Sequence, residues 1–179
     1  MFEKKSSIIS VRVNEDVKRK LTIESELESL TMNTLISRIL VRHVDWDKFA
    51  EDIGFVAVTK SFLRALLEAL SDDKVKSIAV TTCRSAFKDA VIYTQGSLNL
   101  ENLIKTLDLW FSSSHIPFRH IKKESSEKYI VQHELGEKWT IYFNALIGAL
   151  LSDIHYKTAN VVLTQQSVSF EIEKDLTKR

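Results

Sequence analysis

The feature that most constrains this chain is a short apolar segment near the N-terminus that is followed at once by two helix signals. Within Ile8–Val13 the apolar side chains at positions 9, 11 and 13 share one face. Asn14 then opens a charged amphipathic stretch, and Thr31 opens a second stretch that is richer in aliphatic residues. A strand this short cannot bury its own apolar face. A second copy would supply a partner, so the segment predicts an intertwined dimer with a two-stranded ribbon, a shape that fits the DNA major groove.

The opposite face of this strand is polar, and it predicts contacts with DNA. Ser10 and Arg12 can donate hydrogen bonds to base edges, an arginine most often to guanine. A further set of basic side chains and helix-start residues is predicted to contact phosphates. This set consists of Lys4, Lys5, Lys18, Thr31, Met32 and Asn33. The basic run 18–20 is equally typical of a solvated helix face.

This layout resembles the ribbon-helix-helix family of DNA-binding proteins, which includes the Arc and MetJ repressors. The resemblance covers about a quarter of the chain. It rests on Ile9–Val13, Asn14–Val17, Thr31–Thr34 and Ile36. It implies that alternate strand residues, here Ile8, Ser10 and Arg12, enter the major groove. It also implies that the start of the second helix clamps a phosphate.

The chain departs from the family pattern at two places. The turn between the two helices usually carries a glycine, but here it reads Ser29-Leu30. Ile8 stands where a polar base reader is common, so it offers only an apolar contact, for example to a thymine methyl group. The alternative to the ribbon is that this segment forms an edge strand of a single α/β domain.

Net charge, cysteine content and hydropathy bear on whether the chain is a strongly basic, a disulfide-bonded or a membrane-spanning protein. The net charge is only +1, so the DNA prediction depends on where the charges lie and not on their sum. Cys83 is the single cysteine, which excludes an intrachain disulfide and suits a reducing cytoplasm. The sequence contains no apolar run of the roughly 20 residues that span a bilayer, and no signal-peptide pattern. We therefore expect a cytoplasmic protein.

The remainder of the chain predicts a second, larger domain, with boundaries of 1–45 and 46–179. Helices are expected over 44–53, after the caps Thr59, Ser71 and Asn99, and over 137–154. The β-branched run 78–82 suggests a strand, but helical spacing of the apolar residues around it favours a helix. Hairpins are expected over 118–134 and 159–173. The fold class is therefore α+β: a ribbon-helix-helix followed by a helix-rich domain with a small antiparallel sheet and helices on one face.

From Trp46 onward the chain is similar to uncharacterised archaeal proteins that combine a ribbon-helix-helix start with this kind of tail. The most recognisable string is His133–Trp139. This resemblance assigns no activity. The aromatic residues that follow, Trp139, Tyr142 and Phe143, are expected to pack in the core or a dimer interface rather than to form a ligand cage.

Three functions compete on this basis. The first is a homodimeric, sequence-specific transcriptional regulator, such as a repressor, whose C-terminal domain strengthens the dimer and is open to a small-molecule or metal effector. In a metal-responsive version, strand parity would bring His120 and His133 together across the hairpin, although no close ligand pair supports a metal site. The second is an antitoxin-like or scaffold-like module that binds another protein. An enzyme ranks last, because no catalytic or cofactor motif is present, and we expect no cofactor.

Overall fold

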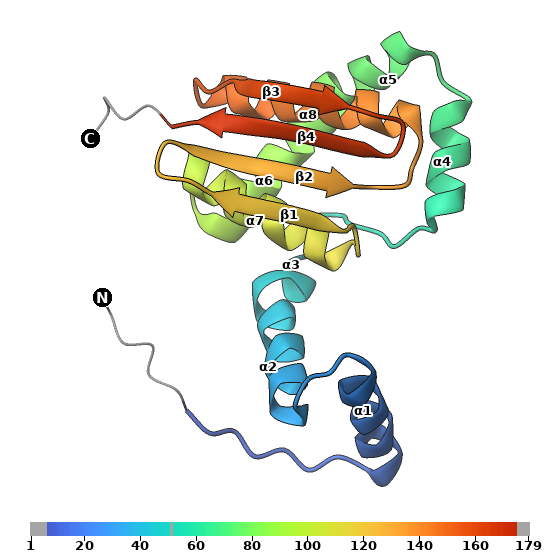
Figure 1. The fold of residues 1–179 in the computed structure, drawn as a ribbon, viewed down its shortest axis with the longest axis vertical. Coiled ribbons are helices and arrows are strands. Elements are labelled where there is room, and N and C mark those ends of the chain that lie inside the picture. The colour runs from blue at the N-terminus through green and yellow to red at the C-terminus, as the bar shows by residue number, and fades with distance from the viewer. Residues whose placement is uncertain (1–6, 51, 175–179) are drawn as a thin grey trace. The chain divides into compact units, whose positions relative to one another are not determined.

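The computed structural model describes residues 7–50 and 52–174. The chain divides into two compact units, Met1–His43 and Val44–Arg179 (Figure 1). This division lies two residues before the boundary expected from the sequence. In the described residues, no helix combines the length and the apolar character that crossing a membrane requires.

The N-terminal unit contains two helices that contact each other, α1 (Glu15–Leu27) and α2 (Met32–Arg42). Both begin at the residues that the sequence indicates. The side chain of Asn14 accepts a hydrogen bond from the amide of Val17 at 2.8 Å, and Thr31 accepts one from the amide of Thr34 at 3.1 Å. These side chains satisfy amides that a helix leaves without internal acceptors, so both predicted N-caps are confirmed.

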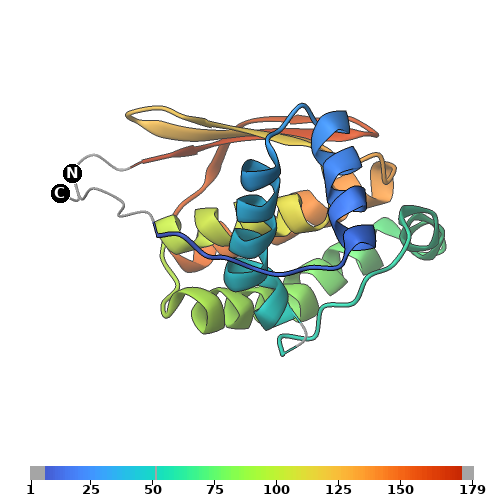
Figure 2. The same cartoon turned by 90° about the horizontal axis from the view of Figure 1, so that it is seen from below.

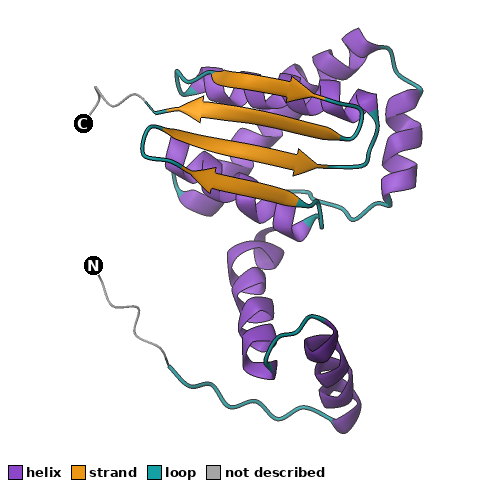
Figure 3. Ribbon diagram, viewed as in Figure 1, coloured by secondary structure: helices purple, strands orange, loops and turns teal. Residues whose placement is uncertain are grey.

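Residues 7–14, which precede α1, form no strand in the single chain (Figure 3). All of them are exposed, including the apolar row: Ile9 is 71 %, Val11 is 70 % and Val13 is 46 % accessible. A β-strand needs a second strand to complete its backbone hydrogen bonds. No other described segment pairs with these residues, so the predicted ribbon requires a partner chain.

The turn from α1 to α2 has a left-handed residue at the position where glycine is usual. Ser29 has a φ of 55°. Its amide donates to the carbonyl of Glu26 at 3.1 Å, and the amide of Leu30 donates to the carbonyl of Ser25 at 2.8 Å. These two bonds form the Schellman pattern that closes a helix. The turn therefore keeps the geometry of a glycine turn, with the steric cost of a side chain.

We expect Ser29→Gly to stabilise the N-terminal unit by about 0.5–1 kcal/mol. The substitution removes a left-handed strain of about 1–2 kcal/mol and costs about 0.4–1 kcal/mol through the freer unfolded chain. Thermal unfolding followed by circular dichroism measures the change. The control is Ser37→Gly at an exposed position in the middle of α2, which should destabilise the same unit by about 0.5 kcal/mol. A loss of stability in Ser29→Gly would contradict a strained turn.

The C-terminal unit is a set of helices followed by a four-stranded sheet. After a π-helical turn (His43–Asp47) come α3 (Lys48–Ala50), α4 (Lys60–Glu68) and α5 (Asp72–Ile78). A second π-helical turn (Ala79–Cys83) leads into α6 (Arg84–Gln95), and α7 (Leu100–Ser113) follows. The helical interpretation of residues 78–82 is confirmed. The remaining elements are β1 (Phe118–Lys122), β2 (Ser126–Gln132), α8 (Glu137–Asp153), β3 (Thr158–Leu163) and β4 (Ser167–Glu173).

The two predicted hairpins join into one antiparallel sheet with the order β1-β2-β4-β3. The second strand of each hairpin therefore lies in the centre, and Tyr129 of β2 pairs with Phe170 of β4. Figure 2 shows α6, α7 and α8 on the same side of this sheet. The expected class, an α+β domain with a small antiparallel sheet and helices on one face, is confirmed.

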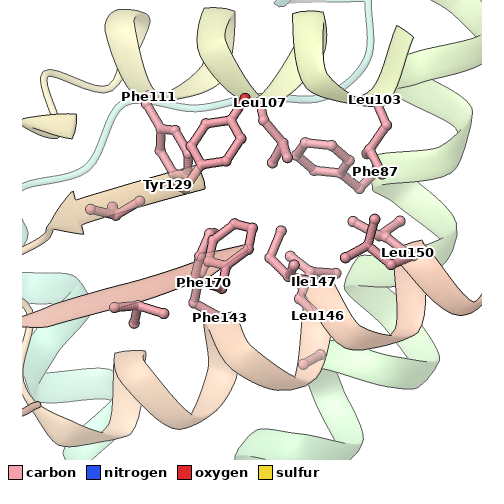
Figure 4. Packing of buried hydrophobic residues seen from close by; sticks show 14 of the residues in the cluster. Phe87, Leu103, Leu107, Phe111, Tyr129, Phe143, Leu146, Ile147, Leu150 and Phe170 are labelled. Atoms are coloured by element: carbon pink, nitrogen blue, oxygen red, sulfur yellow. The ribbon is translucent and has the colours of Figure 1, made fainter. Parts of the chain in front are cut away.

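Aromatic and aliphatic side chains from α7, α8 and the sheet make up the core of this unit (Figure 4). Phe111 of α7 and Phe143 of α8 lie 5.5 Å apart between ring centroids, and Tyr129 stacks on Phe170 at 5.3 Å. All four are almost completely buried. Burial of each such ring contributes about 1.5–3 kcal/mol, so this layer holds the helices against the sheet.

Candidate functional site

The predicted base-reading residues lie together on the exposed segment before α1. Ile8, Ser10 and Arg12 are all exposed, and Ile8 is 96 % accessible. Arg12 forms no ion pair with any residue that the structure describes, so its guanidinium is available to an outside partner. Two of the predicted phosphate contacts, Lys4 and Lys5, lie outside the described residues.

The start of α2 offers a second group of donors. Thr31 uses its side-chain oxygen to cap the helix, and this oxygen also lies 2.8 Å from the hydroxyl of Thr34. The amides of Met32 and Asn33 belong to the first turn, where an α-helix provides no internal acceptor. These amides and the positive end of the helix dipole are suited to an anion.

The basic run at the start of α1 is largely engaged within its own helix. Arg19 and Lys20 each lie 2.6 Å from the carboxylate of Asp16. Hydrogen bonds from Lys20 and Arg19 lower the pKa of Asp16, which therefore remains charged. Lys18 has only a long contact of 4.0 Å with Glu15. Of the three basic residues, Lys18 is the one that keeps most of its charge available for a phosphate.

The expected meeting of His120 and His133 across the hairpin is wrong. In the β1–β2 ladder, His120 pairs with Tyr129, and the pairing begins at Phe118 opposite Val131. His133 follows the end of β2 and lies four residues beyond Tyr129 along the chain. Parity does place both histidines on the inward side, but the register separates them. Within residues 7–50 and 52–174, no group of three or more His, Cys, Asp or Glu side chains is arranged to hold a metal ion.

His120 instead bridges two carboxylates inside the C-terminal unit. Its Nδ1 lies 3.0 Å from Asp108 of α7, and its Nε2 lies 2.7 Å from Glu127 of β2. The ring also stacks on Tyr129 at 4.3 Å. Each of the two ring nitrogens therefore has its own carboxylate partner, and these two contacts fix the orientation of the imidazole. The side chain of His120 is 7 % exposed, and the bridge joins α7 to the hairpin.

Two further contacts complete this bridge. The hydroxyl of Tyr129 donates to Asp108 at 2.6 Å, and Lys174 lies 2.7 Å from Glu127. Burial, followed by the hydrogen bond to Asp108, raises the pKa of Tyr129, so the phenol remains a donor. Strand parity in the sequence singled out His120. It missed Asp108 and Glu127, since neither belongs to a recognisable motif.

His133 has a different role, as a neutral link between three segments. The amide of Leu135 donates to its Nδ1 at 3.0 Å, and its Nε2 lies 3.0 Å from the hydroxyl of Thr140. That hydroxyl in turn donates to the carbonyl of Thr164 at 2.7 Å. Since Nδ1 accepts and Nε2 donates, the ring is neutral. Burial, and then the charge of Lys60, lowers the pKa of His133 to about 4.

We expect this histidine to make the C-terminal unit acid-sensitive. The pKa is about 4 in the folded chain and about 6.5 in the unfolded chain. The stability that it contributes is therefore complete above pH 6.5 and is lost as the pH falls toward 4. The loss is about 2–3 kcal/mol. Urea unfolding between pH 7.5 and pH 4 measures it, with His133→Gln as the test and exposed His155→Asn as the control. A pH slope in His133→Gln that equals the wild-type slope would exclude this origin.

No family model, no curated protein and no solved structure matches this chain. The family resemblance of the first 45 residues therefore gains no support from known proteins, and the function has to be inferred from the site itself.

Proposed function

We propose that this protein is a homodimeric, sequence-specific DNA-binding regulator of transcription, in which residues 8–13 of two copies pair as a ribbon in the major groove. The observation that carries this proposal is the exposed apolar row Ile9, Val11 and Val13, on a segment that pairs with no strand among the residues described by the structure. Each of these side chains forgoes about 1.5–3 kcal/mol of burial free energy if it stays in water. Pairing with a second copy recovers this free energy and completes the backbone hydrogen bonds.

The same pairing would present the other face of the segment to DNA. Because side chains alternate along a strand, burial of Ile9, Val11 and Val13 turns Ile8, Ser10 and Arg12 outward together. A two-stranded ribbon fits the width of the major groove, where a guanidinium can bind guanine with two hydrogen bonds. The amides at the start of α2 would hold a neighbouring phosphate and fix the register of the protein on the duplex.

A titration of random-sequence duplex DNA at increasing salt tests the proposal. Three lysines predicted to contact phosphates, at positions 4, 5 and 18, are supplied by each of two copies. We therefore expect a slope of roughly −5 in a plot of log K against log salt concentration. Selection of bound sequences from the same pool should then yield a short, approximately palindromic site. The absence of binding to any duplex at low salt would contradict the proposal.

Arg12→Ala is expected to weaken binding to the selected site by about 1–3 kcal/mol, which is about 5- to 150-fold, and to relax the preference at one base. Lys18→Ala should weaken all sequences alike and reduce the salt slope by about 1 for each phosphate that is no longer neutralised. Fluorescence anisotropy on the selected and scrambled duplexes measures both effects. Arg119→Ala removes one exposed positive charge from β1 and serves as the control. Full sequence preference in Arg12→Ala would refute the role given to this residue.

A further inference from the structure

A cavity of about 250 Å³ lies within the C-terminal unit among α4, α5, α7 and α8. Leu63 and Leu67 of α4 and Val75 and Ile78 of α5 form its aliphatic walls. Val75 is fully buried, whereas the two leucines and Ile78 are half-buried. The cavity is therefore bordered by one fully buried aliphatic residue and three partly exposed ones, and it is accessible from solvent.

The opposite wall is aromatic and well supported. Trp110 of α7 and Trp139 of α8 lie 6.5 Å apart between ring centroids, and Tyr142 lies 6.3 Å from Trp139. Trp139 stacks on Phe143 at 4.9 Å with an interplanar angle of 7°, and Phe87 contacts the edge of Trp110. Phe87 and Phe143 belong to the buried core, so their contacts support Trp110 and Trp139 on the side away from the cavity lining of α4 and α5. Such a preformed, mostly apolar concavity is typical of small-molecule sites.

The chemistry of the lining excludes a charged occupant. None of the described residues that line the cavity carries a formal charge, and its polar groups are the thiol of Cys83, the hydroxyl of Tyr142 and the indole N–H groups. Burial, and then the neighbouring Cys83 thiol, raises the pKa of Tyr142, so its hydroxyl stays neutral. An ion would lose its hydration here without gaining a countercharge.

The volume sets the size of the occupant. A dry apolar cavity of roughly 150 Å³ holds one benzene ring. A cavity of about 250 Å³ accordingly has room for two fused rings. We infer that this cavity is a binding site for a small, uncharged aromatic molecule with the dimensions of indole or naphthalene. The inference stands on the C-terminal unit alone and does not depend on DNA binding.

Alkylation of Cys83 provides a direct test with the intact protein. Because Cys83 is the only cysteine in the chain, N-ethylmaleimide reports on this cavity alone. Saturating indole should slow the alkylation at least fivefold, and naphthalene should do the same. Indole-3-carboxylate, which has the same rings and a negative charge, should have less than one tenth of the effect of indole at equal concentration. Equal alkylation rates with and without indole would overturn the inference. A second copy of the chain that occupied the cavity would give the same result, because indole could then not enter.

A variant that fills the cavity gives an independent test. Ile78→Trp should abolish the saturation-transfer signal of indole in NMR, whereas Leu163→Trp, on the exposed part of β3, should leave it unchanged. Binding of indole to folded Ile78→Trp would overturn the inference. If Ile78→Trp does not fold, Leu67→Ala enlarges the same cavity. In Leu67→Ala, the protection of Cys83 from alkylation by three-ring carbazole, divided by the protection by indole, should rise at least fivefold over the wild-type ratio. An unchanged ratio would equally overturn the inference.

Discussion

Replacement of Val11 by aspartate is expected to dissociate the dimer and to weaken binding to the selected DNA site by at least 100-fold. Val11 is the central residue of the exposed apolar row, and in the proposed ribbon it is buried between the paired strands and the helices. A carboxylate at this position would be buried without a countercharge, at a cost of several kcal/mol in each copy. Sedimentation velocity measures dissociation, and fluorescence anisotropy measures the change in affinity.

The matched control is Val56→Asp. Val56 is 80 % exposed, precedes α4 and lies in the C-terminal unit. The same change of side chain there should leave the sedimentation coefficient and the DNA affinity within twofold of the wild-type values. If Val11→Asp also remains a dimer with unaltered affinity, the apolar row is not an interface and the ribbon is wrong.

The second large effect is expected at His120. His120→Ala should lower the free energy of unfolding of the C-terminal unit by about 2–4 kcal/mol at neutral pH, since Asp108 and Glu127 each lose a hydrogen-bond partner and Tyr129 loses the ring that stacks on it. Urea unfolding followed by tryptophan fluorescence measures the change. His155→Ala, at an exposed position, should cost less than about 1 kcal/mol.

A double variant separates the effect of the two carboxylate charges from the effect of lost packing. If repulsion between Asp108 and Glu127 dominates, His120→Ala combined with Asp108→Asn should be less destabilised than the sum of the single variants by about 1 kcal/mol or more. Additivity of the two changes would show that His120 acts only through its volume and its stacking on Tyr129.

Local signals in the sequence account for most of the secondary structure. Side chains of Asn14, Thr31, Thr59, Ser71 and Asn99 each cap the helix that they were expected to open. Apolar periodicity also identified the helix through residues 78–82 despite its β-branched composition. The strand order was not predictable in the same way. Each hairpin pairs neighbours in the sequence, but the pairing of β2 with β4 depends on how α8 returns the chain.

The contacts of the candidate site residues could be predicted only in part, because strand register and tertiary packing leave no local signal in the sequence. Parity placed His120 and His133 on the same side, but a shared face does not bring together residues four ladder positions apart. Asp108 reaches His120 through tertiary packing of α7, which has no local signature. Trp139 was expected in the core or in a dimer interface, and it is buried in the core of the C-terminal unit. Its periodicity could not indicate that one side of the ring also borders a cavity.

The most direct test of the paired ribbon is the distance between the two copies of residue 10. A spin label on Ser10→Cys, in a Cys83→Ser background, can be measured by double electron–electron resonance. In an antiparallel ribbon of six residues, equivalent backbone positions lie at most about 20 Å apart, at roughly 3.3 Å per residue. The ribbon therefore predicts an interspin distance below about 30 Å once the label's own length is added to this spacing. The absence of a dipolar signal, or a distance well beyond this limit, would contradict the paired ribbon.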